Sequence, residues 1–114
     1  AHDCSDGCLL VAAVEMAMAG RLGVDLDLAG LPTTGEMEDA VALFAETPGR
    51  YLLEVKADQL DAVVRQLRQA KIAFGQIGSF TATPKLSVRC PRHGRVLETD
   101  IEPLHKAWLG TLDW

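Results

Sequence analysis

The stretch that most constrains the fold of this chain is residues 9–20, which are apolar on nearly every side of a helix. Leu10, Ala13 and Ala17 recur at the spacing of one helical face, and the positions between them are also mostly apolar. Glu15 is the only charged residue from position 9 to position 19. A helix that is apolar nearly all round is typical of a protein interior. The sequence therefore predicts a buried helix on which the rest of the chain packs.

A polar, glycine-containing turn leads into this helix. Ser5 or Asp6 can cap it by accepting hydrogen bonds from its first backbone N–H groups. Because a helix N-terminus carries partial positive charge, it suits an anion such as phosphate. Asp3 and Asp6 would repel a phosphate unless a cation lay between them, and Mg²⁺ commonly fills that place. The turn is a candidate magnesium–phosphate site; the alternative is that Ser5 and Asp6 only cap the helix and His2 is a surface residue.

Composition limits the class of protein. The length of 114 residues suits one domain, and an apolar content of 48% is ample for a core. The formal net charge of −5 argues against a nucleic-acid-binding or anionic-membrane surface. No apolar run approaches a transmembrane length, and three cysteines give no disulfide framework, which favours a reducing cytoplasm. Since the chain opens inside the polar turn without Met, we expect residues 1–114 to be a single domain excised from a longer multidomain protein.

The remainder of the chain alternates between strand-like and helix-like segments. Strands are expected at residues 24–28, 51–55, 72–77, 85–90 and 95–98, and helices at residues 9–20, 36–44, 57–70 and from Asp100 onward. This order predicts an α+β fold in which helices cover a mixed or antiparallel sheet. Residues 51–77 are expected to form a right-handed strand–helix–strand crossover, and the last two strands a hairpin with a longer loop.

Helical spacing also predicts which side chains of two helices face the core. The inward side chains are expected to be Met37, Ala40, Val41 and Phe44 on the helix at 36–44, and Leu104, Ala107 and Trp108 on the last helix.

The cysteines suggest a different site. Cys4 and Cys8 lie across the helix start, and Cys90 is followed by His93 in a segment that resembles half of a zinc knuckle. Three cysteines and one histidine form a legitimate structural zinc set. The two halves are far apart in the sequence, however, and free cysteine is commonly buried as a small hydrophobe. The alternative function is thus a non-catalytic binding or assembly module, with or without a structural zinc held by Cys4, Cys8, Cys90 and His93.

Four motifs, in order along essentially the whole chain, resemble those of the aminoimidazole-ribonucleotide-synthase-like ATP-dependent enzymes. They are the turn His2-Asp3-Cys4-Ser5-Asp6-Gly7, the segment from Leu43 to Arg50, the pair Ile77-Gly78 and the closing Ala107 to Leu112. Where the family has a second glycine in the turn, this chain has Cys8. Glycine lets a backbone approach a phosphate closely, so a side chain there would narrow that approach.

The resemblance implies part of a larger enzyme with the C-terminal α+β fold of that family. It is strongest to the branch that uses ATP and glutamine-derived ammonia to amidate formylglycinamide ribonucleotide in purine biosynthesis. There, a domain like this one pairs with an N-terminal barrel-forming domain, and a glutaminase domain or subunit supplies ammonia. The resemblance implies ATP and Mg²⁺ as cofactors of the full-length enzyme, none tightly bound to this fragment, and no activity of the fragment alone.

The resemblance also implies a set of site-lining residues, none of them catalytic. Asp3 corresponds to a Mg²⁺ ligand. The expected nucleotide- or phosphate-binding residues are His2, Ser5, Asp6, Gly7, Glu46, Thr47 and Arg50.

Overall fold

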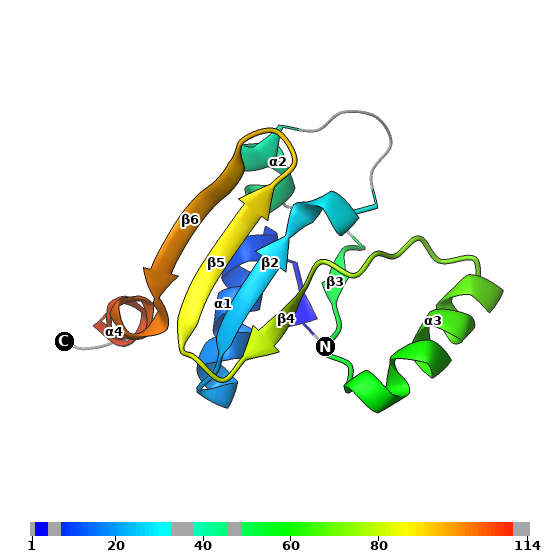
Figure 1. Cartoon of the computed structure of the whole chain (residues 1–114), viewed down its shortest axis with the longest axis horizontal. Coiled ribbons are helices and arrows are strands. Elements are labelled where there is room, and N and C mark those ends of the chain that lie inside the picture. The colour runs from blue at the N-terminus through cyan, green and yellow to red at the C-terminus, as the bar shows by residue number, and fades with distance from the viewer. Residues whose placement is uncertain (1, 5–7, 33–37, 46–48, 111–114) are drawn as a thin grey trace.

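The computed structural model describes residues 2–4, 8–32, 38–45 and 49–110, and it has an α+β fold (Figure 1). The helices are α1 (Cys8–Gly20), α2 (Asp39–Phe44), α3 (Leu60–Gln69) and α4 (Ile101–Gly110). The strands are β1 (His2–Asp3), β2 (Gly23–Asp27), β3 (Tyr51–Leu52), β4 (Gly78–Thr81), β5 (Lys85–Cys90) and β6 (Gly94–Asp100). Short 3₁₀ helices lie at Leu28–Gly30 and Ala57–Gln59. In these described ranges no helix is long and apolar enough to cross a bilayer.

Four strands form the main sheet, in the order β4-β2-β5-β6. β2 and β5 pair in parallel, with Val24 opposite Leu86, and the other two pairings are antiparallel. The predicted fold class, helices against a mixed sheet, is confirmed. The predicted hairpin is also confirmed, because β5 and β6 pair directly, although β6 is longer than expected.

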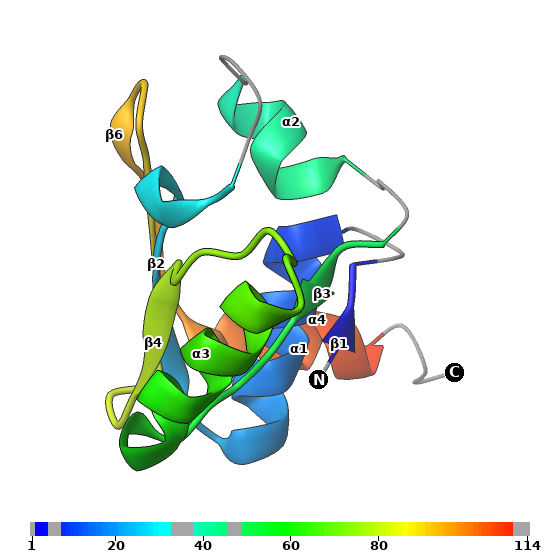
Figure 2. The same ribbon diagram turned by 90° about the vertical axis from the view of Figure 1, so that its right-hand side faces the viewer.

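The predicted buried helix is confirmed as α1. It lies against one face of the main sheet, on the same side as α4 (Figure 2). Leu9, Ala13 and Ala17 are buried there with Val24 and Val88 of the sheet. α1 also contacts α2, β1 and β3, which accounts for its apolar residues on nearly every side.

The predicted crossover at residues 51–77 is wrong. β3 pairs with β1 in a separate two-stranded sheet, with Asp3 opposite Tyr51, whereas β4 belongs to the main sheet. Residues 72–77, predicted as a strand, run as irregular backbone into β4. There, Gly75 approaches Gly30 so closely that an added Cβ would lie 1.7 Å from the Gly30 carbonyl oxygen. This backbone contact with the 3₁₀ turn takes the place of a strand ladder.

The predicted inward faces of α2 and α4 are mostly wrong. On α2, Ala40, Val41 and Phe44 are exposed, and the buried side chains are Asp39, Ala42 and Leu43. On α4, Leu104 packs against the core as predicted, but Ala107 and Trp108 are exposed. Met37 lies outside the described residues.

Long-range polar contacts explain the orientation of α2. His93 Nδ1 lies 2.5 Å from Asp39 Oδ2, and Arg92 pairs with Glu38, so the turn between β5 and β6 holds the start of this helix. Because α2 has six residues, its own periodicity constrains its orientation less than these contacts do.

Candidate functional site

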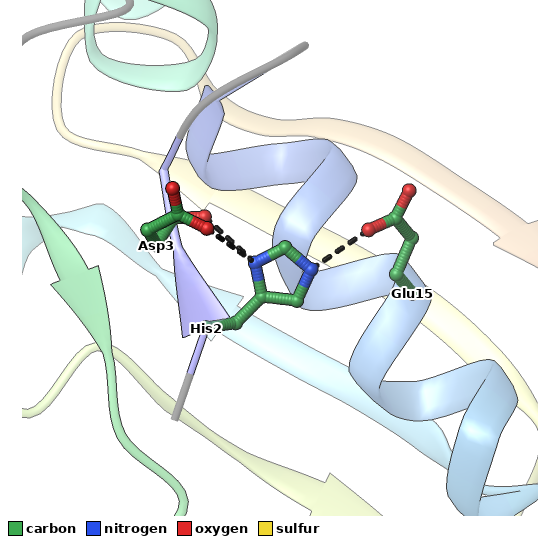
Figure 3. A network of polar contacts seen from close by, with 3 residues as sticks. All are labelled: His2, Asp3 and Glu15. Atoms are coloured by element: carbon green, nitrogen blue, oxygen red, sulfur yellow. Dashed lines mark hydrogen bonds and ion pairs between the residues drawn. The ribbon is translucent and has the colours of Figure 1, made fainter.

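The histidine of the N-terminal motif joins β1 to the middle of α1 (Figure 3). His2 Nε2 lies 2.8 Å from Glu15 Oε2, and Nδ1 donates to the Asp3 carbonyl oxygen at 2.7 Å. Both ring nitrogens face oxygen acceptors, and only the imidazolium donates from both. The pKa of His2 is accordingly raised, first by the Asp3 carbonyl and then by the Glu15 carboxylate. A phosphate that binds His2 would have to share these donors.

Asp3, the predicted Mg²⁺ ligand, has an open carboxylate. Its side chain is 63% exposed, and Oδ1 lies 3.7 Å from His2 Nδ1. Such a group is accessible to a cation, which in proteins commonly takes one or two carboxylates together with phosphate oxygens. Among the described residues, no three His, Cys, Asp or Glu side chains are grouped so that they could hold a metal. A cation on Asp3 would therefore need further ligands from outside the described residues, such as phosphate oxygens of a bound nucleotide.

Arg50, the predicted anion contact, is half-buried at the end of α2. Its Nη2 donates to the Ala42 carbonyl oxygen and its Nη1 to that of Ala45, both at 3.1 Å. These are carbonyls of the last turn of α2, where a cation also suits the helix dipole. Nη1 lies 3.4 Å from Cys8 Sγ as well. Arg50 therefore links the end of α2 to the start of α1.

Arg50 also brings together the borders of the two motif segments. The backbone N–H of Cys4 donates to the Arg50 carbonyl oxygen at 2.9 Å, and the Arg50 side chain reaches both Cys8 and Ala45. Cys4 and Cys8 border residues 5–7, and Ala45 and Gly49 border residues 46–48. The predicted site residues Ser5, Asp6, Gly7, Glu46 and Thr47 lie outside the described residues. Three of the flanking positions meet at Arg50: Cys4 contacts its backbone, and Cys8 and Ala45 contact its guanidinium.

The structure does not support the zinc site that the cysteines suggested. Cys4, Cys8 and Cys90 are all buried in the core, and burial is the largest cause of the raised pKa of the Cys4 and Cys90 thiols. His93 is turned to Asp39 instead. The described cysteines and histidines form no metal-binding group. These cysteines are small hydrophobes of the core.

A shallow hollow of about 410 Å³ lies on the sheet face opposite α1. Its charged lining residues are Asp25, Asp27, Arg89 and Arg95. Since both signs of charge are present, the lining of this hollow does not favour an anion.

Sequence reasoning does not identify two polar pairs, one at the site and one at the start of α2. At the site, Glu15 is the only charged residue of an apolar helix, which is a signal that a polar partner such as His2 faces it. Asp39 and His93 are 54 residues apart, and nothing in the local sequence of either indicates the other.

The chain belongs to the family described as AIR synthase related protein, C-terminal domain, whose model matches residues 1–91. The chain is also similar to proteins named phosphoribosylformylglycinamidine synthase subunit PurL. The chain is 47% identical over 78 residues to that of Rhodospirillum rubrum, covering 68% of this chain and 10% of the relative. It is 38% identical over 108 residues to that of Rhodopseudomonas palustris, covering 95% and 14%. The chain thus spans a small part of these relatives.

Solved structures of PurL from Thermotoga maritima share the fold. The ATP complex of that protein superposes with a TM-score of 0.78 at 23% identity, covering 90% of this chain and 18% of that one. The PurLQS structure gives a TM-score of 0.72 at 21% identity, covering 89% and 17%. At such identities the likeness shows the fold, and residue roles do not follow from it.

Proposed function

We propose that this chain is the C-terminal domain of a phosphoribosylformylglycinamidine synthase, an ATP-dependent ligase that amidates formylglycinamide ribonucleotide. The relatives named above support this proposal, and so does the match along residues 1–91. The observation that carries it is the meeting of Cys4, Cys8 and Ala45 around Arg50. Through these contacts, the borders of both motif segments, 5–7 and 46–48, come together at the start of a buried helix.

The residues of this chain would bind and orient a nucleotide rather than perform the chemistry. Asp3 would hold Mg²⁺ through its open carboxylate, with Ser5, Asp6 and Gly7 at the phosphate. Glu46 and Thr47 would line the same cleft. His2 and Arg50 would keep β1 and α2 in place beside it, because their donors already serve Glu15 and the end of α2. When bound, ATP would supply the phosphoryl group that activates the amide oxygen.

The partner of this domain would be the barrel-forming N-terminal domain of the same enzyme. Relatives are many times longer than this chain, which leaves room for such a domain. Phe44 is 51% exposed, Tyr51 is 68% exposed and Leu53 is 53% exposed, and exposed large apolar side chains commonly mark an interaction surface. A glutaminase domain or subunit would deliver the ammonia. PurL of Thermotoga maritima is named as part of a PurLQS structure, which supports assembly of this kind.

A binding module without chemistry of its own is the second candidate, and Cys8 favours it. This residue has a φ of 50°, a conformation that glycine adopts easily, and the family has glycine there. Cys8 is fully buried and contacts Arg50, so its thiol packs in the core. Phosphate binding would survive this replacement if only the backbone of the turn faces the ligand.

Nucleotide binding to the complete protein that contains this chain tests the proposal. Calorimetric titration with ATP and Mg²⁺ should show binding, and Asp3→Asn should weaken it by about tenfold or more, as loss of a charged metal ligand does. Asp25→Asn, an exposed acid in the hollow on the other sheet face, is the matched control and should bind as the unchanged protein does. Amidation of formylglycinamide ribonucleotide by the complete protein tests the enzyme assignment separately. No product in that assay would refute the synthase, and equal binding by both variants would remove Asp3 from the site.

A further inference from the structure

The short ladder between β1 and β3 places Asp3 directly opposite Tyr51. Directly opposite residues of an antiparallel pair point to the same face of the sheet, with Cβ atoms about 5 Å apart. The other opposite pair, His2 and Leu52, points to the other face, because side chains alternate along a strand. The ladder therefore has one face that carries Asp3 and Tyr51 and one that carries His2 and Leu52.

The contacts of the second pair show which face is turned outward. His2 Nε2 reaches Glu15 of α1, and Leu52 packs against the hydrophobic core. The face that carries Asp3 and Tyr51 is consequently turned away from α1. The Asp3 side chain is 63% exposed and Tyr51 is 68% exposed. A carboxylate and an aromatic ring are thus presented side by side on the outer face of the ladder.

Tyr51 is unusually open for a residue of its type. Its exposure is the highest among the large apolar and aromatic side chains of the described residues. Its hydroxyl forms no hydrogen bond within the described part of the chain. Tyrosine rings contribute a large contact area when they are covered, and the face of such a ring is a common surface for a flat ligand. The ring of Tyr51 is therefore available to a ligand that also reaches Asp3.

A nucleotide has the two chemical parts that this face can bind. Its phosphates take a divalent cation that one or two carboxylates can hold, as proposed for Asp3. Its base is flat, and proteins bind bases by stacking them on aromatic side chains. Because Asp3 and Tyr51 are direct neighbours across the ladder, both lie within reach of one nucleotide.

We propose that Tyr51 is the stacking surface for the adenine of ATP, whose phosphates are held through Mg²⁺ at Asp3. This inference rests on the proposed function, because it takes Asp3 as the metal ligand. Formylglycinamide ribonucleotide carries an open-chain amide in place of a base, so the aromatic ring assigns this face to ATP rather than to the substrate that is amidated. Tyr51 also belongs to the surface that would face the barrel-forming domain, and the base would lie between the two domains.

The test separates the base from the phosphates by comparing ATP with inorganic tripolyphosphate, each with Mg²⁺. Both ligands are titrated calorimetrically into the complete protein and its variants. Tyr51→Ala should weaken the binding of ATP by about tenfold, as loss of one stacking partner does, and should leave the affinity for tripolyphosphate unchanged. Asp3→Asn should weaken the binding of both ligands, which identifies the titrated site as the one on this domain.

Matched variants show whether the ring itself is responsible. Tyr51→Phe and Tyr51→Trp keep an aromatic face and should bind ATP as tightly as the unchanged protein does. Trp108→Ala removes another exposed aromatic side chain, on α4 and well away from β3 in Figure 1, and should leave both affinities unchanged.

Each other result has a distinct meaning. Unchanged binding of ATP by Tyr51→Ala would overturn the inference and leave the proposed function standing. Equal weakening of ATP and tripolyphosphate by Tyr51→Ala would also overturn it, because the ring would then support the phosphate site and not the base. Binding of neither ligand by the unchanged protein would refute the nucleotide site of the proposed function, and this inference with it.

Discussion

Glu15 Oε2 and His2 Nε2 lie 2.8 Å apart, which joins a two-residue strand to the middle of a buried helix. The carboxylate is the only charge on the apolar stretch of α1, and the imidazole is its partner in the described structure. Because the ring also donates to the Asp3 carbonyl oxygen, it is held at both nitrogens. The pair fixes the position at which the motif turn leaves β1.

Removing the Glu15 charge should cost little stability and lower the pKa of His2. Both side chains are about one-third exposed, and pairs of this kind contribute below about 1 kcal/mol. Glu15→Gln should therefore lower the free energy of unfolding by less than about 1 kcal/mol, measured with urea. The His2 pKa, followed by NMR of its ring protons, should fall toward its ordinary value. Glu98→Gln, at an exposed pair on β6, is the control that should leave the His2 titration unchanged.

The same pair gives stability a defined pH dependence. The folded-state pKa of His2 is raised above 6.5, so the folded protein holds the proton more tightly than the unfolded chain does. The contribution of His2 is present in full below pH 6.5 and is lost as the pH rises through the folded pKa. Urea unfolding across that range should show His2→Gln converging with the unchanged protein at alkaline pH. A difference that instead grew with pH would contradict the sign.

Arg50→Ala should loosen α2. The variant removes two hydrogen bonds to carbonyls of the last helical turn, and we expect a loss of about 1–3 kcal/mol in unfolding free energy. Hydrogen exchange should become faster for the amides of α2, measured by NMR. Arg68→Ala, on the exposed side of α3, is the matched control and should change stability by less than about 0.5 kcal/mol. Unchanged protection of α2 would mean that Arg50 does not cap it.

The core strand β5 should be far more sensitive to truncation than the surface of α4. Leu86 is 1% exposed and faces α1 from the sheet, whereas Leu109 is 47% exposed. Leu86→Ala should cost about 2–5 kcal/mol, because it leaves a cavity in addition to the lost burial. Leu109→Ala removes the same atoms and should cost less than about 1 kcal/mol. Calorimetric melting of both variants makes the comparison.

Gly75→Ala should destabilise the protein through a backbone clash. The new Cβ would lie 1.7 Å from the Gly30 carbonyl oxygen, so residues 72–77 would have to move away from the 3₁₀ turn. Overpacking of this kind costs about 1–3 kcal/mol. Gly110→Ala has nothing within 4 Å and should be neutral or slightly stabilising. Equal melting temperatures for the two variants would show that the close approach is absent in solution.

The part of the fold that could be predicted from the sequence is the part with strong local patterns. α1 could be predicted because its own residues are apolar on nearly every side. The β5–β6 hairpin could be predicted because its two strands are joined by one short turn. The exposed Phe44 and Trp108 were misplaced because α2 and α4 are oriented by contacts across the chain, such as that between Asp39 and His93. The β1–β3 pairing joins two residues to two others, which is too short for any pattern.

The candidate site divides in the same way. Asp3 and Arg50 were identified because motifs mark them, and the structure places both next to the motif segments. The hydrogen bonds from Arg50 to the end of α2 could not be predicted, because they depend on the positions of Ala42 and Ala45 in the fold. Which residues form hydrogen bonds depends on their positions in three dimensions. A sequence motif gives only the residue types and their spacing.

The parallel pairing of Val24 with Leu86 also sets how the chain must acquire its shape. The two strands are far apart in the sequence, at residues 23–27 and 85–90, so their pairing closes a long loop. Closing a long loop costs conformational entropy, and proteins with such non-local contacts fold more slowly. The domain is therefore expected to refold slowly for its size, with helical structure in α1 appearing ahead of the central ladder.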